Sequence, residues 1–205
     1  MRIDELEARV LALPERDMRH LVAISGPPAA GKSTLAAELV ARLGPGAILV
    51  PMDGFHLDNA VLAPRGLLDR KGAPETFDAL GFVHAMQRLA TETEVVLPDF
   101  DRAQDRAIAG RIVVGPAHRI AVVEGNYLSC THAPWNRLAR LWSLSVFLDR
   151  RMPSCARGCW RAGRPRGLTP KRRRGGPTRT TWRTSPSCGQ AGIPRPSCSD
   201  CRAQA

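Results

Sequence analysis

The stretch that decides the fold is Gly26-Pro27-Pro28-Ala29-Ala30-Gly31-Lys32-Ser33. It matches the pattern G-x-x-x-x-G-K-[ST] without a mismatch, and it lies between a short apolar run, Leu21–Ser25, and a helix-forming run, Ser33–Leu43. The two glycines let the backbone curl so that its N–H groups point inward, and the following helix presents the positive end of its dipole to the same place. The sequence therefore predicts a phosphate-binding loop between a buried strand and a helix; a plain Gly/Pro turn is the alternative.

Such a loop binds the phosphates of a nucleotide such as ATP, together with Mg²⁺. The residues expected to contact the nucleotide are Gly26, Ala29, Ala30, Gly31, Lys32, Ser33 and Thr34. Lys32 can reach the β- and γ-phosphates, and the Ser33 hydroxyl can ligate Mg²⁺. Kinases, ATPases and GTPases share this loop, so the loop alone does not choose among them. The sequence lacks the Asn-Lys-x-Asp motif that reads guanine.

Around the loop, residues 1–150 alternate short apolar runs with helical patterns. The strand candidates are Leu21–Ser25, Ala47–Pro51, Val95–Leu97, Ile112–Val114, Arg119–Glu124 and Leu144–Leu148. The helix candidates are Ile3–Leu13, Ser33–Leu43, Phe77–Ala90 and Trp135–Arg140. This alternation predicts an α/β domain, with a parallel sheet covered by helices on both faces.

Two acidic residues stand at the ends of predicted strands. Asp53 follows the run Ala47–Pro51, and Glu124 closes the run Arg119–Glu124. The carboxyl ends of parallel strands face the crevice in which ligands bind. There Asp53 can accept a proton from an attacking hydroxyl, and Glu124 can serve Mg²⁺ directly or through water. Each acid can instead cap a turn, and His56 can either contact an acceptor or hydrogen-bond locally.

Several motifs in one order resemble the phosphoribulokinase/uridine kinase family, with a further likeness to pantothenate kinases and fructose-transport kinases. The motifs are Gly26–Thr34, Asp53-Gly54-Phe55-His56, Gly72-x-Pro74-x-x-Phe77-Asp78, Pro98-x-Phe100-Asp101 and Glu124-Gly125. The resemblance covers residues 18–149. It implies ATP-dependent phosphorylation of a hydroxyl on a small metabolite such as a sugar, a nucleoside or a pantothenate-like molecule.

The resemblance also implies roles for individual residues. Asp53 would be the base, and Glu124 would support metal or substrate. The acceptor would lie near His56, Lys71, Asp78, Asp101 and Tyr127. A nucleotide-binding NTPase module without kinase turnover is the alternative that the residues leave open.

The net charge of +11 is confined to the end of the chain. Residues 151–205 hold 13 Lys and Arg and one acid, a net of +12, so residues 1–150 have 17 basic and 18 acidic residues, a net of −1. The basic segment is rich in Pro, Gly and Arg and has three residues of the Leu, Ile, Val, Met and Phe set. It is too poor in apolar residues for a core, and we expect it to be unstructured.

The family pattern ends after Asp149, and our hypothesis is that the segment that follows is translated in a shifted reading frame. The family would continue with a helix, an Arg-bearing lid over ATP, a helix with Asp-Asp-Leu and a last strand. None of these appears, yet one alternative frame allows an amphipathic helix over 152–162, an Ala-Asp-Asp-Leu pattern over 178–185 and a strand over 192–199. An in-frame gene sequence across codons 145–160, with a matching intact mass, would show that the segment is genuine.

These features set expectations for partners, location and activity. With no apolar span of about 20 residues and no secretory signal, we expect a cytoplasmic protein without a membrane partner. If the basic segment is genuine, it could bind nucleic acid, and this is a further alternative. The net charge alone does not lead us to infer such a partner. The sequence leaves open whether the protein forms a homodimer. Without a lid, this chain is expected to bind ATP weakly and to turn over slowly or not at all.

Overall fold

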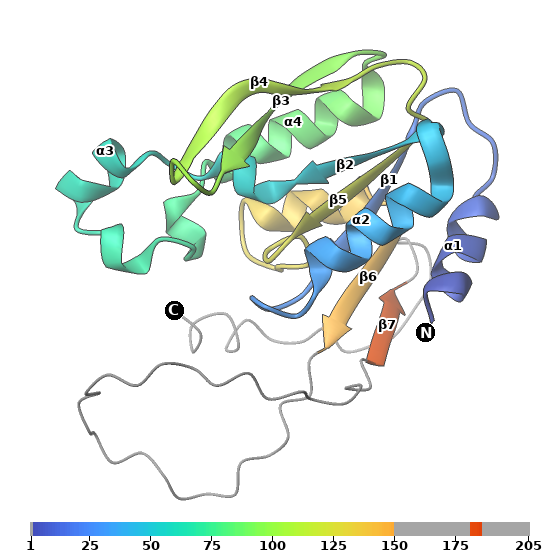
Figure 1. The fold of residues 1–205 in the computed structure, drawn as a ribbon, viewed down its shortest axis with the longest axis horizontal. Coiled ribbons are helices and arrows are strands. Elements are labelled where there is room, and N and C mark those ends of the chain that lie inside the picture. Colours follow the sequence, from blue (N-terminus) through green and yellow to red (C-terminus); the bar gives the residue numbers. More distant parts are fainter. Residues whose placement is uncertain (1, 150–180, 186–205) are drawn as a thin grey trace, which may run out of the picture.

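The computed structural model describes residues 2–149 and 181–185 (Figure 1). The strands are β1 (His20–Ser25), β2 (Ala47–Pro51), β3 (Val95–Asp101), β4 (Arg106–Val114), β5 (Ile120–Gly125), β6 (Leu144–Asp149) and β7 (Thr181–Ser185). The α-helices are α1 (Ile3–Leu11), α2 (Lys32–Leu43), α3 (Asn59–Leu62) and α4 (Ala79–Thr91). The 3₁₀ turns are η1 (Gly44–Gly46), η2 (Met52–Phe55), η3 (Ala63–Arg65), η4 (Leu68–Arg70), η5 (Pro74–Thr76) and η6 (Trp135–Arg140).

The main sheet has the order β2-β5-β1-β6-β7, and its first four strands are parallel. In the register, Ser25 at the end of β1 pairs with Gly125 in β5, and Pro51 at the end of β2 pairs with Glu124. The carboxyl ends of β1, β2 and β5 therefore meet at one edge of the sheet. The predicted α/β fold with a parallel sheet is confirmed.

The strands of this sheet are apolar throughout because both faces are covered. Along β1, Leu21 and Ala23 belong to the core beneath α4, while Val22 and Ile24 belong to the core beneath α1 and α2. Alternate residues of a strand point to opposite faces, so a doubly covered strand needs apolar side chains at every position. Figure 1 shows α2 and α4 on opposite sides of the sheet.

The runs predicted as Val95–Leu97 and Ile112–Val114 form strands, but these strands do not join the main sheet. Instead, β3 and β4 are longer than predicted and pair with each other as an antiparallel hairpin. A short connection permits only antiparallel pairing, because parallel neighbours require a long crossover. Val95, Leu97 and Val114 of the hairpin are buried in the same core as α4.

After residue 149, the structure describes only residues 181–185. These form β7, which runs antiparallel to β6 at the edge of the sheet. Thr and Trp in this stretch favour extended backbone, which sparse apolar content does not reveal. The remaining predictions for 151–205, including the shifted frame, lie outside the described residues.

Arg19, just before β1, is a buried cation with 4% exposure. Its guanidinium donates to five carbonyl oxygens, three of them at the end of α4 and the others in the segment between β4 and β5. These acceptors are Leu89, Glu92, Thr93, Gly115 and His118. Arg19 thus satisfies the carbonyls that the last turn of α4 leaves without partners.

No helix in the described ranges, 2–149 and 181–185, combines the length and apolar character that crossing a membrane requires.

Candidate functional site

The phosphate loop has the predicted place, between the end of β1 at Ser25 and the start of α2 at Lys32. Gly26 has φ +154°, and a Cβ at this position would lie 2.6 Å from the carbonyl oxygen of Leu148 in β6. Gly31, the residue before α2, has φ +89°, in the region that favours glycine. Both glycines of the motif are therefore required by the backbone, one by close approach and one by its conformation.

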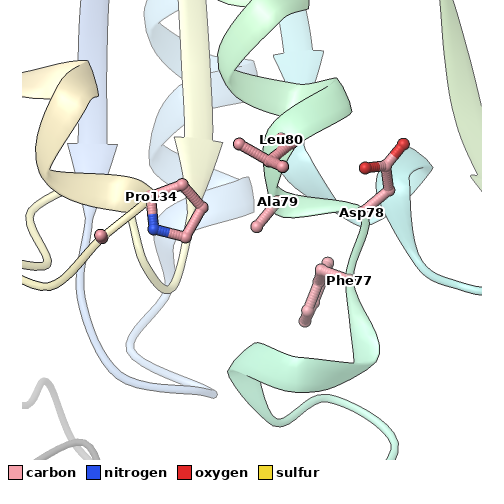
Figure 2. A pocket seen from close by; sticks show the side chains of 6 residues that line it. Phe77, Asp78, Ala79, Leu80 and Pro134 are labelled. Atoms are coloured by element: carbon pink, nitrogen blue, oxygen red, sulfur yellow. The ribbon is translucent and has the colours of Figure 1, made fainter.

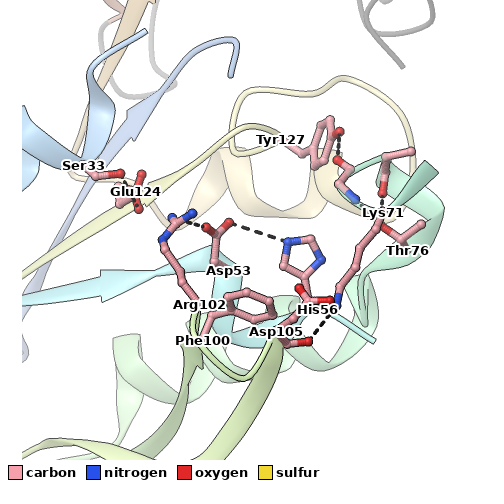
Figure 3. Close-up of polar contacts among 12 residues, drawn as sticks. Ser33, Asp53, His56, Lys71, Thr76, Phe100, Arg102, Asp105, Glu124 and Tyr127 are labelled. Carbon is pink, nitrogen blue, oxygen red and sulfur yellow. Dashed lines mark hydrogen bonds and ion pairs between the residues drawn. The ribbon is translucent and has the colours of Figure 1, made fainter. Parts of the chain in front are cut away.

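Lys32 and Ser33 begin α2 and face the end of β5. Lys32 has 7% exposure, and its Nζ donates to the carbonyl of Pro27 at 2.9 Å. Burial lowers the pKa of Lys32, while the charges of Glu124 and Asp53 act in the opposite direction. Ser33 Oγ donates to Glu124 Oε1 at 3.1 Å (Figure 3). The loop thus has a buried cation beside a hydroxyl and a carboxylate.

Glu124 has 6% exposure at the end of β5. Burial raises the pKa of Glu124, the nearby Asp53 carboxylate raises it further, and the Ser33 hydrogen bond opposes both. Oxygen ligands of this kind suit Mg²⁺, which typically takes one or two protein ligands and completes its shell with phosphate and water. Within the described residues, no group of three or more His, Cys, Asp and Glu could hold a metal by itself. Ser33 and Glu124 therefore fit Mg²⁺ that arrives with a nucleotide.

Asp53 lies in η2, directly after β2, so the sheet register brings it beside Glu124. Its Oδ2 accepts from Arg102 Nη2 at 2.9 Å, and its Oδ1 lies 4.0 Å from His56 Nε2 (Figure 3). The second distance exceeds a hydrogen bond. One carboxylate oxygen of Asp53 is therefore hydrogen-bonded to Arg102, and the other faces His56 without a hydrogen bond.

His56 is held among aromatic rings at the end of η2. Its ring stacks on Phe77 with centroids 3.9 Å apart, and it lies 5.0 Å from the ring of Phe100. Within the described part of the chain, its buried Nδ1 has no hydrogen-bond partner. Burial lowers the pKa of His56, with the Asp53 carboxylate as the largest opposing effect. The imidazole thus has Nε2 directed at Asp53 at 4.0 Å, beyond hydrogen-bond distance.

Lys71 connects two segments around this site. Its Nζ donates to Asn59 Oδ1 at 2.7 Å and to the Asp105 carbonyl at 2.8 Å, and it also pairs with the Asp105 carboxylate. Tyr127, which follows β5, donates its hydroxyl to the Gly72 carbonyl. Both residues hold the segment after α3 against its neighbours, so they shape the wall of the site through these contacts.

Two carboxylates that were predicted near the acceptor are engaged in local structure. Asp78 caps α4, because its Oδ1 accepts from the Gly81 N–H at 2.8 Å. Asp101 pairs with Arg111 at 3.0 Å and accepts from the backbone N–H of Ala103. The Arg111 hydrogen bond lowers the pKa of Asp101. Their roles toward an acceptor stay predictions.

Asp78 also borders an open pocket of about 420 Å³ at the start of α4. The pocket is lined by Phe77, Asp78, Ala79, Leu80, Ala133 and Pro134 (Figure 2). Phe77 separates this pocket from His56, because its ring stacks on the imidazole.

Arg102 is a residue of the candidate site that the sequence did not single out. It stands in a polar turn between β3 and β4, and no spacing in the sequence connects it to Asp53, 49 residues earlier. The sequence indicates β3 and β4 only as two separate runs, and their pairing as a hairpin places Arg102 in the turn from which it reaches Asp53.

Gly54 sets the distance between η2 and the hairpin. A Cβ on Gly54 would lie 2.4 Å from the carbonyl oxygen of Pro98 in β3. We expect Gly54→Ala to destabilise the protein by about 1–3 kcal/mol and to move Arg102 away from Asp53. Urea denaturation measures the first effect. Gly46→Ala is the matched control, since nothing lies within 4 Å of its added Cβ; equal stability of both variants would contradict the prediction.

Comparison with known proteins finds similar proteins that are named as kinases. A solved structure from Silicibacter sp. TM1040, a candidate fructose transport system kinase, has a TM-score of 0.69 and 48% identity, over 73% of this chain and 75% of that one. A candidate uridine kinase of Schizosaccharomyces pombe is 34% identical over 71% of this chain and 66% of its own length. A pantothenate kinase of Rhodopseudomonas palustris (strain TIE-1) is 32% identical over 72% of this chain and 50% of its own length.

The scan against models of known protein families found no match. The chain spans about half to two thirds of the length of the curated relatives it matches. The solved structure is nevertheless 48% identical to this chain, and the match covers 75% of the solved chain. With the phosphate loop after β1, Asp53 in η2 and Glu124 in β5, the chain belongs to the phosphoribulokinase/uridine kinase family of P-loop kinases.

Proposed function

We propose that this protein transfers the γ-phosphoryl group of ATP to a hydroxyl of a small metabolite. The observation that carries the proposal is the position of Asp53. The parallel register between β2 and β5 sets Asp53 beside Glu124, and its charge acts on both Glu124 and Lys32 of the phosphate loop. A carboxylate at this place can take a proton from a hydroxyl that attacks a phosphate held by the loop.

The residues divide into a nucleotide side and an acceptor side. On the nucleotide side, the backbone of the loop and Lys32 would bind phosphate, and Ser33 and Glu124 would hold Mg²⁺, which neutralises phosphate charge when bound. On the acceptor side, Asp53 Oδ1 would receive the proton, while the neutral His56 can donate from Nε2 to the acceptor oxygen. An oxygen can contact both atoms at once, because they are only 4.0 Å apart.

The acceptor would be a polar small molecule. The relatives named above are described as kinases of fructose transport, uridine and pantothenate, and this range supports a hydroxyl-bearing metabolite without choosing one. Lys71, Tyr127, Asp78 and Asp101 would border it. A cytoplasmic location and the absence of a nucleic-acid partner belong to this proposal too.

A panel of acceptors tests the proposal directly. The purified chain is incubated with Mg²⁺ and γ-radiolabelled ATP, together with fructose, uridine or pantothenate in turn. We expect label to appear on at least one acceptor at a low rate, since no Arg-bearing lid pattern follows Asp149 in the sequence. Release of phosphate at one rate with every acceptor and with none would instead support the nucleotide-binding NTPase module.

A further inference from the structure

The ion pair between Arg102 and Asp53 connects the β3–β4 hairpin to η2. Arg102 is the first residue of the turn between β3 and β4, and its guanidinium extends from the hairpin to Asp53 Oδ2 (Figure 3). The Arg102 side chain is 76% exposed, and an ion pair with so exposed a partner adds little to stability. The stability of the hairpin therefore depends little on this pair, and Arg102 can leave Asp53 at small cost.

A second arginine of the same hairpin shows the contrast. Arg111 in β4 pairs with Asp101 in β3, so its ion pair stays within the hairpin. Arg102 instead pairs across to η2, with an acid that faces the phosphate loop. Of these two arginines, only Arg102 brings a charge from the hairpin into the site.

Arg102 completes a group of four interacting charges at the edge of the sheet. Lys32 and Arg102 are the cations, and Asp53 and Glu124 are the anions. Arg102 donates to Asp53 Oδ2, and Ser33, the residue after Lys32, donates to Glu124 Oε1. The formal charges cancel, so the group is balanced before any ligand is bound.

A nucleotide with its Mg²⁺ would change the partners within this group. Mg²⁺ would bind at Glu124, the acid beside the phosphate loop, and the phosphate oxygens would pair with the cations of the site. Lys32, buried at the loop, supplies the first cation. The planar fork of a guanidinium binds phosphate as well as carboxylate, and an exposed side chain can turn from one to the other without losing packing.

We propose that Arg102 binds the terminal phosphate of ATP, leaving the Asp53 carboxylate when the nucleotide is bound. The inference rests on the proposed function, because it takes ATP as the ligand of the loop. Two consequences follow. The terminal phosphate gains a cation from the acceptor side of the site, opposite Lys32. Asp53 Oδ2 loses its partner at the same time, so both oxygens of the base become open to the acceptor hydroxyl only while ATP is present.

The test compares two nucleotides that differ in the terminal phosphate. Isothermal titration calorimetry on the full chain measures binding of Mg²⁺ with AMPPNP, the β,γ-imido analogue of ATP, and of Mg²⁺ with ADP. We expect Arg102→Ala to weaken AMPPNP binding about 10- to 100-fold, since a charged hydrogen bond is lost, and to change ADP binding less than about 2-fold. Arg102→Lys is expected to restore part of the lost affinity.

Arg111→Ala is the matched control for nucleotide binding, because it removes a cation of the same hairpin that pairs with Asp101 and not with Asp53. It is expected to leave both affinities unchanged, and thermal melting shows that each variant is folded. Equal loss for both nucleotides, no loss for either, or a wild-type chain that does not prefer AMPPNP would overturn the inference. A chain that passes this test yet phosphorylates no acceptor would refute the proposed function while leaving the role of Arg102 intact.

Discussion

Asp53→Asn lowers the rate of phosphoryl transfer by about 10²- to 10⁴-fold, the range typical for loss of a general base. The amide keeps the shape of the side chain but cannot take the proton of the acceptor hydroxyl. The Asp53 side chain is hydrogen-bonded to Arg102 and not to the phosphate loop, so we expect that affinity for Mg²⁺ and ATP does not weaken. Transfer of label from γ-radiolabelled ATP to the acceptor identified in the panel measures the rate, and calorimetry measures the affinity.

Asp69→Asn serves as the control for this experiment. Asp69 lies in η4 and is exposed, so its loss removes one negative charge without reaching the site. Its variant is expected to retain the wild-type rate. If Asp53→Asn matched that rate as well, Asp53 would not be the base and the proposed chemistry would fail.

Arg19→Met is expected to lower the free energy of unfolding by about 3–4 kcal/mol, because a buried acceptor left without its donor typically costs about 1–3 kcal/mol and several are affected here. Methionine fills much of the volume of the arginine stem but donates nothing to the five carbonyls around it. The midpoint of thermal unfolding should fall by about 10 °C for a domain of this size. Calorimetric melting and urea denaturation both report the change.

Arg106→Met is the companion variant. Arg106 begins β4 and is exposed, so the same chemical change there should alter stability by less than about 0.5 kcal/mol. A similar loss of stability in both variants would mean that removal of a positive charge, and not loss of the carbonyl contacts of Arg19, lowers the free energy of unfolding.

The positions of the phosphate loop and of Asp53 could be predicted because they depend on local sequence. Gly26 and Gly31 are required by the backbone of the loop itself, and a strand that ends in an acid places that acid at the ligand-binding edge. The parallel sheet followed for the same reason, since strands buried on both faces are apolar at successive positions.

What could not be predicted depends on contacts between distant segments. Arg102 reaches Asp53 only because β3 and β4 pair with each other, and the two runs taken separately suggested two more strands of the sheet. Arg19 has no neighbour in sequence that indicates its carbonyl partners. Asp78 is different, because an acid just before a helical pattern is a signal for a cap, and that signal could have been weighed against a role at the acceptor.

The close approach of Gly26 to Leu148 gives the nucleotide loop a support that no loop motif contains. A Cβ on Gly26 would meet the backbone oxygen and Cβ of Leu148, so the limit is set by the backbone of β6 and not by the end of the Leu148 side chain. A change that shifts the path of β6 by a fraction of an ångström would nevertheless move the loop, and with it the affinity for nucleotide. Two relatives with identical phosphate-binding sequences can therefore differ in how tightly they hold ATP, and the cause would lie in a strand more than a hundred residues away.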